Sequence, residues 1–179
     1  YRTLPGTHPT KGSYFTRGTS RDRFARYTEE GPAYVDNMQR LLKKFETAKS
    51  IVPRPVETRA EQTTPYGVIY YGSTSAAMRE ALETLAGEGI QLDALRVRAF
   101  PFHDDVAEFI ARHEKVFVVE QNRDAQLRGL IVNECGVDPA RLVPVLHYDG
   151  TPITANFIRA AIADRASALN VIPLRKATP

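Results

Sequence analysis

The chain has 179 residues, of which 42% are hydrophobic and 25% charged, with a formal net charge of +3. This composition is typical of a globular domain that is long enough to bury a core. Cys135 is the sole cysteine, which excludes an internal disulfide and an iron–sulfur cluster held by this chain alone, because such clusters need four thiolates. No apolar run approaches the roughly 18 residues of a membrane span.

Positive charge is concentrated in the first third of the chain. Residues 1–60 hold 12 Lys or Arg against 6 Asp or Glu, whereas residues 61–179 hold 12 against 15. A basic arm of this kind either binds nucleic acid or lies on an acidic protein neighbour. We favour the protein neighbour and expect neither nucleic acid nor a membrane as partner. A single cysteine and no signal-like apolar stretch at the start lead us to expect a cytoplasmic protein.

Residues 1–32 are predicted to form an irregular basic arm. Four glycines and three prolines interrupt any periodic pattern there, and an irregular segment of this length is unusual inside a compact domain. We therefore expect the arm to lie on another domain or subunit. Its anchors would be its aromatic residues, Tyr14, Phe15, Phe24 and Tyr27. Because the chain starts at Tyr1 rather than at Met, we interpret it as part of a longer protein.

A helix is predicted over residues 33–49, followed by a proline-containing linker that extends to residue 65. The helix prediction rests on one apolar face with spacings of i, i+4, i+7, i+8 and i+11. Its members are Tyr34, Met38, Leu41, Leu42 and Phe45. The linker prediction rests on Pro53, Pro55 and Pro65.

Residues 66–179 show strands that alternate with helices. Apolar runs predict strands at 68–71, 92–100, 116–119 and 142–147, and helical periodicity follows each of them. This alternation indicates βαβ units with right-handed crossovers. We predict an α/β domain with three α/β/α layers and a mostly parallel sheet of four or five strands. In the strand at 92–100, the alternation with Arg96 and Arg98 predicts one solvated or subunit-facing side.

Two polar turns are candidate sites. Gly72, Ser73 and Thr74 follow the first strand, where a turn can bind phosphate or where Ser73 or Thr74 can cap the next helix. Glu120, Gln121 and Asn122 follow the most apolar strand, with Gln126 at the start of the next helix. These groups either contact a ligand, since ligands bind at the carboxyl ends of parallel strands, or tie loops and subunits together.

No catalytic residue, cofactor site or metal site can be assigned from the residues themselves. The four histidines lack the spacing of a zinc site. The chain also lacks the GxGxxG, P-loop and GxSxG motifs. Beside an assembly role, two alternatives remain open: a nucleotide or CoA binding domain that uses the Gly72 and Glu120 loops, and a nucleic-acid-binding arm.

The order of several motifs resembles the C-terminal part of α subunits of 2-oxoacid:ferredoxin oxidoreductases. In the first part of the chain the similarity lies in Leu4-Pro5-Gly6, Tyr14, Glu29, Met38 and Lys43-Lys44-Phe45. Further on it lies in Tyr71-Gly72-Ser73-Thr74, Pro101-Phe102, Val119-Glu120-Gln121-Asn122 and Gln126-Leu127. Two stretches depart from the family pattern, residues 19–23 and Phe102-His103, so these motifs leave the substrate subgroup open.

The resemblance implies a fold like the transketolase C-terminal domain. It also implies a whole enzyme that uses thiamine diphosphate, Mg²⁺ and [4Fe–4S] clusters to convert a 2-oxoacid, foremost 2-oxoglutarate, and CoA into acyl-CoA with reduction of ferredoxin. The partners it implies are the β subunit and the remaining α-subunit domains. Because this chain lacks a thiamine motif and cluster ligands, we expect it to assist assembly and to be inactive alone.

Overall fold

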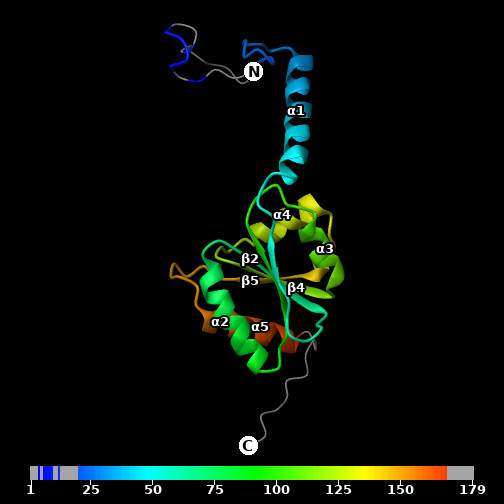
Figure 1. Cartoon of the computed structure of the whole chain (residues 1–179), viewed down its shortest axis with the longest axis vertical. Helices are drawn as coiled ribbons and strands as arrows, with labels where there is room; N and C mark the ends of the chain where they lie inside the picture. The colour runs from blue at the N-terminus through cyan, green and yellow to red at the C-terminus, as the bar shows by residue number, and fades with distance from the viewer. Residues whose placement is uncertain (1–3, 5, 10–11, 13–19, 169–179) are drawn as a thin grey trace, which may run out of the picture. The chain divides into compact units, whose positions relative to one another are not determined.

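The computed structural model describes residues 4, 6–9, 12 and 20–168 of the chain (Figure 1). The chain divides into two compact units, Tyr1–Ser50 and Ile51–Pro179. Among the described helices, none combines the length and the apolar character needed to cross a membrane. Two of the expected aromatic anchors, Tyr14 and Phe15, lie outside the described residues.

The first unit consists of helix α1, Gly31–Lys49, and the part of the arm that precedes it. Pro32 occupies the first turn of α1, where its missing N–H costs no helical hydrogen bond. Before the helix, Arg21 and Tyr27 form an isolated antiparallel bridge. The Arg23 guanidinium donates to both carboxylate oxygens of Asp36, at 2.9 and 3.0 Å. Residues 20–30 therefore fold back onto the first turns of α1.

The second unit is built on a five-stranded sheet with the order β1-β3-β2-β4-β5. Its strands are β1 (Val56–Thr58), β2 (Tyr66–Tyr71), β3 (Asp93–Val97), β4 (Lys115–Glu120) and β5 (Leu142–Leu146). All neighbouring pairs are parallel except β1 with β3, which is antiparallel. Pro144 in β5 occupies an edge strand, where a missing donor is tolerated. The predicted mostly parallel sheet is thus confirmed.

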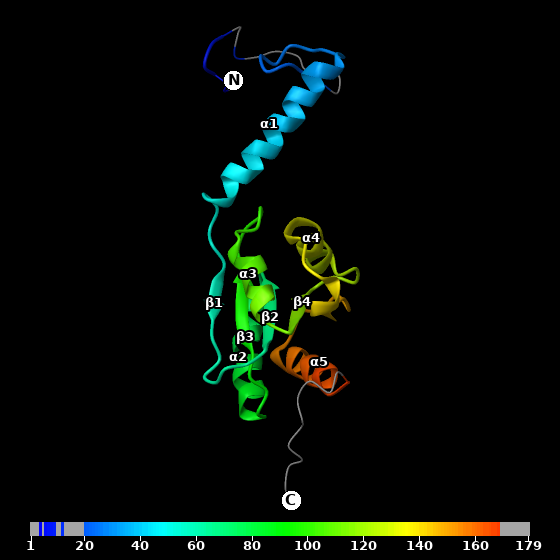
Figure 2. The ribbon, with the colours of Figure 1, turned by 90° about the vertical axis from the view of Figure 1, so that its right-hand side faces the viewer.

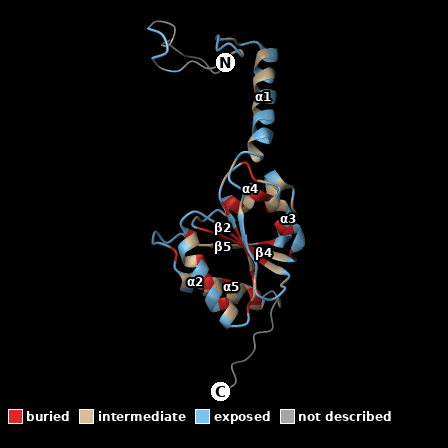
Figure 3. Cartoon of the chain, viewed as in Figure 1, coloured by how far each residue is buried: buried red, intermediate tan, exposed pale blue. Residues whose placement is uncertain are grey.

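Helices cover both faces of the sheet. Helices α2 (Thr74–Gly87) and α5 (Ala155–Ala168) pack on one face, and α3 (Asp105–Arg112) and α4 (Gln126–Cys135) pack on the other (Figure 1). The short 3-10 helix η1, Pro139–Arg141, precedes β5. In β4, Phe117 and Val119 enter the core under α2 and α5, while Val116 and Val118 enter the other core. Buried residues accordingly concentrate on the strands and the inner helix sides (Figure 3), which confirms the three layers.

The segment predicted as a plain linker contributes the edge strand β1, which pairs with β3, so the sheet includes residues before residue 66 (Figure 2). Three residues between prolines are too short for a periodic signal, and all three are exposed. Side chains fasten the segment further. Arg54 donates to Asp105 at 2.7 and 3.0 Å, and this hydrogen-bonded guanidinium holds the pKa of the Asp105 carboxyl below its ordinary value. The resulting stabilisation is present above that ordinary value and is lost as the pH falls through the lowered pKa.

Strand β3 differs from the prediction of one solvated side. Ala94 and Leu95 are both buried, in the two different cores. Only Arg96, near the end of the strand, is exposed. The reason is position, because β3 lies inside the sheet between β1 and β2 and has helices on both faces.

Gly67 in β2 permits the close packing of α3 on the sheet. A Cβ at this position would lie 2.7 and 2.8 Å from the ring atoms Cε1 and Cζ of Phe109. We predict that Gly67→Ala lowers the free energy of unfolding by about 1–3 kcal/mol through overpacking. The matched control is Gly129→Ala in α4, where an added Cβ meets nothing within 4 Å. That change should be neutral or stabilise by up to about 1 kcal/mol through helix propensity. Chemical denaturation of both variants measures this, and equal stability of the two would contradict the packing.

Candidate functional site

The polar turns after β2 and β4 meet at the point where the sheet reverses its strand order. The chain leaves β2 toward β3 on one side, and β4 then pairs with β2 on the other side. The turn after β2 leads into α2 on one face, and the turn after β4 leads into α4 on the opposite face. In open α/β sheets this divergence opens the crevice in which ligands bind. The residues predicted from sequence therefore occupy the ligand position of this fold class.

Glu120, the last residue of β4, is fully buried, with 0% of its surface exposed. Its Oε2 accepts hydrogen bonds from the Leu127 backbone N–H and the Asn122 side-chain amide, both at 2.7 Å. Its Oε1 accepts from the Arg128 backbone N–H at 3.0 Å. The carboxylate thus occupies the N-terminus of α4, where unpaired N–H groups and the helix dipole favour a negative charge. Burial is tolerable because both oxygens are paired.

Asn122 completes this arrangement from within the loop. Its Oδ1 accepts from the backbone N–H groups of Asp124 at 3.1 Å and Gln126 at 3.2 Å. Ala125, between them, has a left-handed backbone with φ of 52°, a conformation that disfavours a residue with a Cβ. The first three N–H groups of α4, those of residues 126–128, are all bound by Glu120 and Asn122. Both side chains therefore act as the cap of this helix.

Gln121 crosses from the β4 turn to the β2 turn. Its Nε2 donates to Ser73 Oγ at 3.0 Å and to Thr74 Oγ1 at 3.1 Å. The two turns are therefore in direct contact, which is one of the alternatives that the sequence left open. The predicted capping role of Ser73 or Thr74 is wrong, because neither side chain bonds to the start of α2. Their hydroxyls face Gln121 instead, while the Ser75 hydroxyl donates to the Gly72 carbonyl at 2.7 Å.

The turns at residues 72–74 and 120–122 together form a corner at the strand ends. His147, which follows β5, borders this corner, and its role was not evident from the sequence. Its backbone N–H donates to the Glu120 carbonyl at 3.0 Å, which continues the β4–β5 pairing. Its ring is buried, and Nε2 donates to the Thr151 carbonyl at 2.9 Å. The ring also packs on Phe157 of α5, with 4.7 Å between centroids. A single His with no zinc-type spacing gave no signal for this structural position.

A hollow of about 440 Å³ lies beside the corner, on the side of α4. Its walls come from the ends of β2 and β3, the loop that follows β3, and the start of α4. The lining includes Tyr71, Arg98, Phe100, Phe102 and Leu130. Phe100 and Phe102 meet edge to face, with centroids 5.3 Å apart. Arg98 and Pro101-Phe102 stand apart in the sequence, and nothing in the sequence indicates that they border one hollow with Tyr71.

The corner has the chemistry of a structural joint. It offers one carboxylate and two carboxamides, and each of these side chains has a hydrogen-bond partner inside the protein. Throughout the described residues, no buried side-chain nitrogen or oxygen lacks a partner. No group of three His, Cys, Asp or Glu in those residues could hold a metal ion. The arrangement positions α4 and joins two strand ends.

The fold defines the class of domain. A split-gene transketolase, solved as an inactive β4 tetramer, superposes with a TM-score of 0.50 at 18% identity, over 63% of this chain and 41% of that chain. The α/β unit therefore has the fold of the transketolase C-terminal domain. A 2-oxoglutarate:ferredoxin oxidoreductase from Magnetococcus marinus superposes with a TM-score of 0.71 at 21% identity, over 87% of this chain and 27% of that chain.

Residues 65–148 match the family model for pyruvate:ferredoxin oxidoreductase core domain II. The α subunit of 2-oxoacid:ferredoxin oxidoreductase 2 from Aeropyrum pernix is 26% identical over 149 residues, or 81% of this chain and 23% of that protein. Residues 65–148 thus match core domain II, and the resemblance to 2-oxoacid:ferredoxin oxidoreductase α subunits that the sequence predicts is confirmed. The chain spans about a quarter of the length of the curated relatives it matches.

The cap on α4 can be tested by replacing Glu120. Glu120→Gln should lower the free energy of unfolding by about 1–3 kcal/mol, because an amide cannot accept at both oxygen positions and leaves a buried donor unpaired. Gln121→Ala is the matched comparison, since Gln121 is exposed, and it should cost about 1 kcal/mol or less. Urea denaturation of the chain measures both. A larger loss for Gln121→Ala than for Glu120→Gln would refute the capping role.

Proposed function

We propose that this chain is part of the α subunit of an enzyme that oxidatively decarboxylates a 2-oxoacid to acyl-CoA and passes the electrons to ferredoxin. The supporting observation is that the Aeropyrum pernix α subunit matches 149 residues, well beyond the 65–148 segment of domain II. The similarity to this α subunit therefore extends beyond residues 65–148. As the 2-oxoacid we propose 2-oxoglutarate, which the Magnetococcus marinus enzyme was solved with. The setting we propose is the cytoplasm.

Within that enzyme, the role we propose for this chain is assembly. The polar groups at the strand ends are bonded to one another, so the corner fixes the shape of the domain. Thiamine diphosphate, Mg²⁺ and [4Fe–4S] clusters would be held by the β subunit and by the remaining α-subunit domains. The residues of this chain do not fit a cluster, because Cys135 is its sole cysteine and four thiolates are needed. CoA and ferredoxin would bind to the whole complex.

A second candidate is an independent domain that binds a nucleotide or CoA. The observation that favours it is the hollow of about 440 Å³ beside Gly72, with Arg98 and two aromatic rings in its walls. Against it, the N–H groups at the start of α4 are bonded to Glu120 and Asn122 rather than left for a phosphate. Titration of the chain with CoA or ATP separates the candidates. A rise in melting temperature that grows with ligand concentration would favour this second function.

The assembly role predicts that the chain alone has no 2-oxoacid oxidation activity. The assay would contain thiamine diphosphate, Mg²⁺, CoA, 2-oxoglutarate and a viologen acceptor. Activity should appear when the chain is part of an α subunit that is co-expressed with the β subunit. Turnover by the isolated chain would contradict the proposal, and so would full activity of a complex from which residues 51–168 have been deleted.

Substituting the corner separates assembly from chemistry in the complex. Glu120→Gln and Asn122→Ala should reduce the amount of complex recovered, because both loosen the start of α4. Per assembled complex, turnover should remain within about tenfold of the parent, a barrier change of roughly 1.4 kcal/mol. Size-exclusion chromatography followed by activity per unit of complex measures this. A thousandfold loss in a correctly assembled complex would assign the corner a chemical role.

A further inference from the structure

His113 caps the C-terminus of α3 and lies in the interior, with 3% of its surface exposed. Its ring nitrogen Nδ1 lies 2.6 Å from the Phe109 carbonyl oxygen, and its Nε2 lies 3.2 Å from Oδ2 of Asp93. A carbonyl oxygen has no proton to donate, so Nδ1 must carry the proton of that contact. The contact between Nε2 and Asp93 then needs a second proton, because a neutral ring with Nδ1–H presents a lone pair at Nε2.

Two features of the surroundings favour a ring that carries both protons. The C-terminus of a helix is the negative end of its dipole, where a cationic imidazole is stabilised. Asp93, the first residue of β3, adds a carboxylate whose side chain is 20% exposed. A hydrogen bond between charged groups is stronger than one between neutral groups. The geometry therefore favours an imidazolium that is paired with a carboxylate.

Asp93 also holds the segment that follows β1. Its second oxygen, Oδ1, accepts a hydrogen bond from the Ala60 backbone N–H at 2.9 Å. Ala60 is two residues after Thr58, the last residue of β1. A chain of hydrogen bonds thus runs from the Phe109 carbonyl of α3 through His113 and Asp93 to Ala60, and we call it the His113 link.

Other charged groups near His113 bond to partners of their own. Arg112 donates to Glu57 at 2.9 Å, and Arg141 donates to the His113 backbone carbonyl at 3.1 Å rather than to its ring. Asp93 is the group that contacts the ring, so the protonation of the ring is coupled most closely to Asp93. Besides Asp93, the titratable and charged groups of the surrounding elements include Glu57 of β1, Tyr66 of β2, Arg112 of α3, Glu114 and Lys115 around the start of β4, and Arg141 of η1.

We propose that the His113 link is a proton-dependent fastening of the segment between α1 and β2, which is firm while the His113 ring carries both protons and loosens when the ring loses one. Without its proton, Nε2 and the Asp93 carboxylate present lone pairs to each other and repel. Movement of Asp93 then withdraws the acceptor of the Ala60 N–H. Imidazole rings exchange this proton between about pH 5 and pH 8, so the fastening is present at the lower end of that range and is lost as the pH rises. This inference does not depend on which reaction the whole enzyme performs.

The other end of the same segment responds to pH in the opposite direction. There the Arg54 guanidinium holds the pKa of the Asp105 carboxyl below its ordinary value, so that bond is lost as the pH falls through the lowered pKa. Strand β1 lies between Arg54 and Ala60 in the sequence. The edge strand is therefore held at both ends between these two limits of pH.

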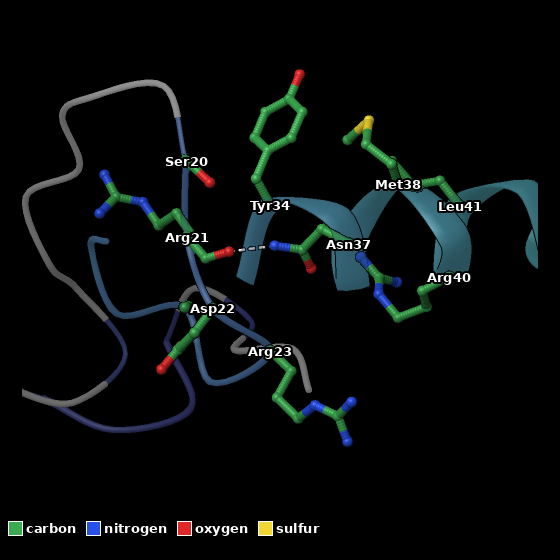
Figure 4. Close-up of a pocket in the computed structure, with 10 residues that line it drawn as sticks. Ser20, Arg21, Asp22, Arg23, Tyr34, Asn37, Met38, Arg40 and Leu41 are labelled. Carbon is green, nitrogen blue, oxygen red and sulfur yellow. Dashed lines mark hydrogen bonds between the residues drawn. The ribbon is translucent and has the colours of Figure 1, made fainter. Parts of the chain in front are cut away.

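The first unit contains a link of a different kind, which uses no titrating group. The Asn37 side-chain amide donates to the Arg21 carbonyl, as Figure 4 shows. Neither an amide nor a carbonyl gains or loses a proton between about pH 5 and pH 8. This contact therefore serves as the internal reference for the effect of pH on the His113 link.

Nitrogen NMR of the full chain tests the proposal on the unmodified protein. Between about pH 5 and pH 8, Nδ1 of His113 should remain protonated, while Nε2 should lose its proton as the pH rises. Hydrogen exchange, corrected for the intrinsic pH dependence of amide exchange, should show the protection of the Ala60 amide falling about two- to tenfold over the same range. The signals of the Asn37 side-chain amide provide the reference in the same samples.

Asp93→Asn separates the charge of Asp93 from its structural role. The new side-chain oxygen can still accept from Ala60, and the new amide can donate to Nε2 of a neutral ring. Nε2 should therefore stay unprotonated, and the protection of Ala60 should no longer change with pH. His103→Gln is the matched control, because His103 also lies 3.2 Å from a carboxylate, that of Asp105, but its Nδ1 accepts the Asp105 backbone N–H. This control should retain the pH dependence at Ala60.

The proposal is overturned by an unprotonated Nδ1, by protection of Ala60 that does not depend on pH in the unmodified chain, or by an Asp93→Asn chain that keeps the full pH dependence. Loss of the pH dependence in His103→Gln would also overturn it, because the response would then arise at the other end of the segment. The measurement on the ring nitrogens needs no variant, so it decides the question even if Asp93→Asn fails to fold.

Discussion

The second unit depends on one buried carboxylate. Glu120 ends the most apolar strand, and its two oxygens accept three hydrogen bonds, two of them from the start of α4. A buried charge without hydrogen-bond partners would be costly. The charge of Glu120 is tolerated because it accepts hydrogen bonds from N–H groups at the start of α4, which would otherwise have no partner. The strand end and the helix start are thereby fixed to each other, and the β5 backbone joins them through His147.

This joint changes what the strand ends can do. In related folds the divergence of two helices at reversed strands opens a crevice for a ligand. Here Gln121 spans that divergence to Ser73 and Thr74, and the α4 donors are already bound. The position typical of a binding site therefore holds a structural connection. A domain of this kind suits an enzyme whose cofactors lie elsewhere, which is the role proposed for the chain.

The sequence predicted the α/β layers because a strong signal encodes them, and it left a contact between the two turns as one alternative. Val116–Val119 is apolar on both faces, and residues in parallel strands that neighbour each other end at the same edge. It did not predict β1, since three exposed residues have no periodicity. It also left the Ser73 and Thr74 hydroxyls either as a helix cap or as part of a phosphate-binding turn. Their actual partner, Gln121, is 47 or 48 residues away in the sequence. Rules for helix caps consider only residues within one helical turn, so they cannot predict this contact.

Hydrogen exchange at individual amides of the chain tests the central joint most directly. The Leu127 and Arg128 N–H groups belong to the first turn of α4, where amides ordinarily exchange quickly because they have no helical acceptor. Bound to a buried Glu120, they should exchange as slowly as the amides of β4, through global unfolding. The same two amides should become fast in Glu120→Ala while β4 remains slow. Rapid exchange of Leu127 and Arg128 in the unmodified chain would contradict the account.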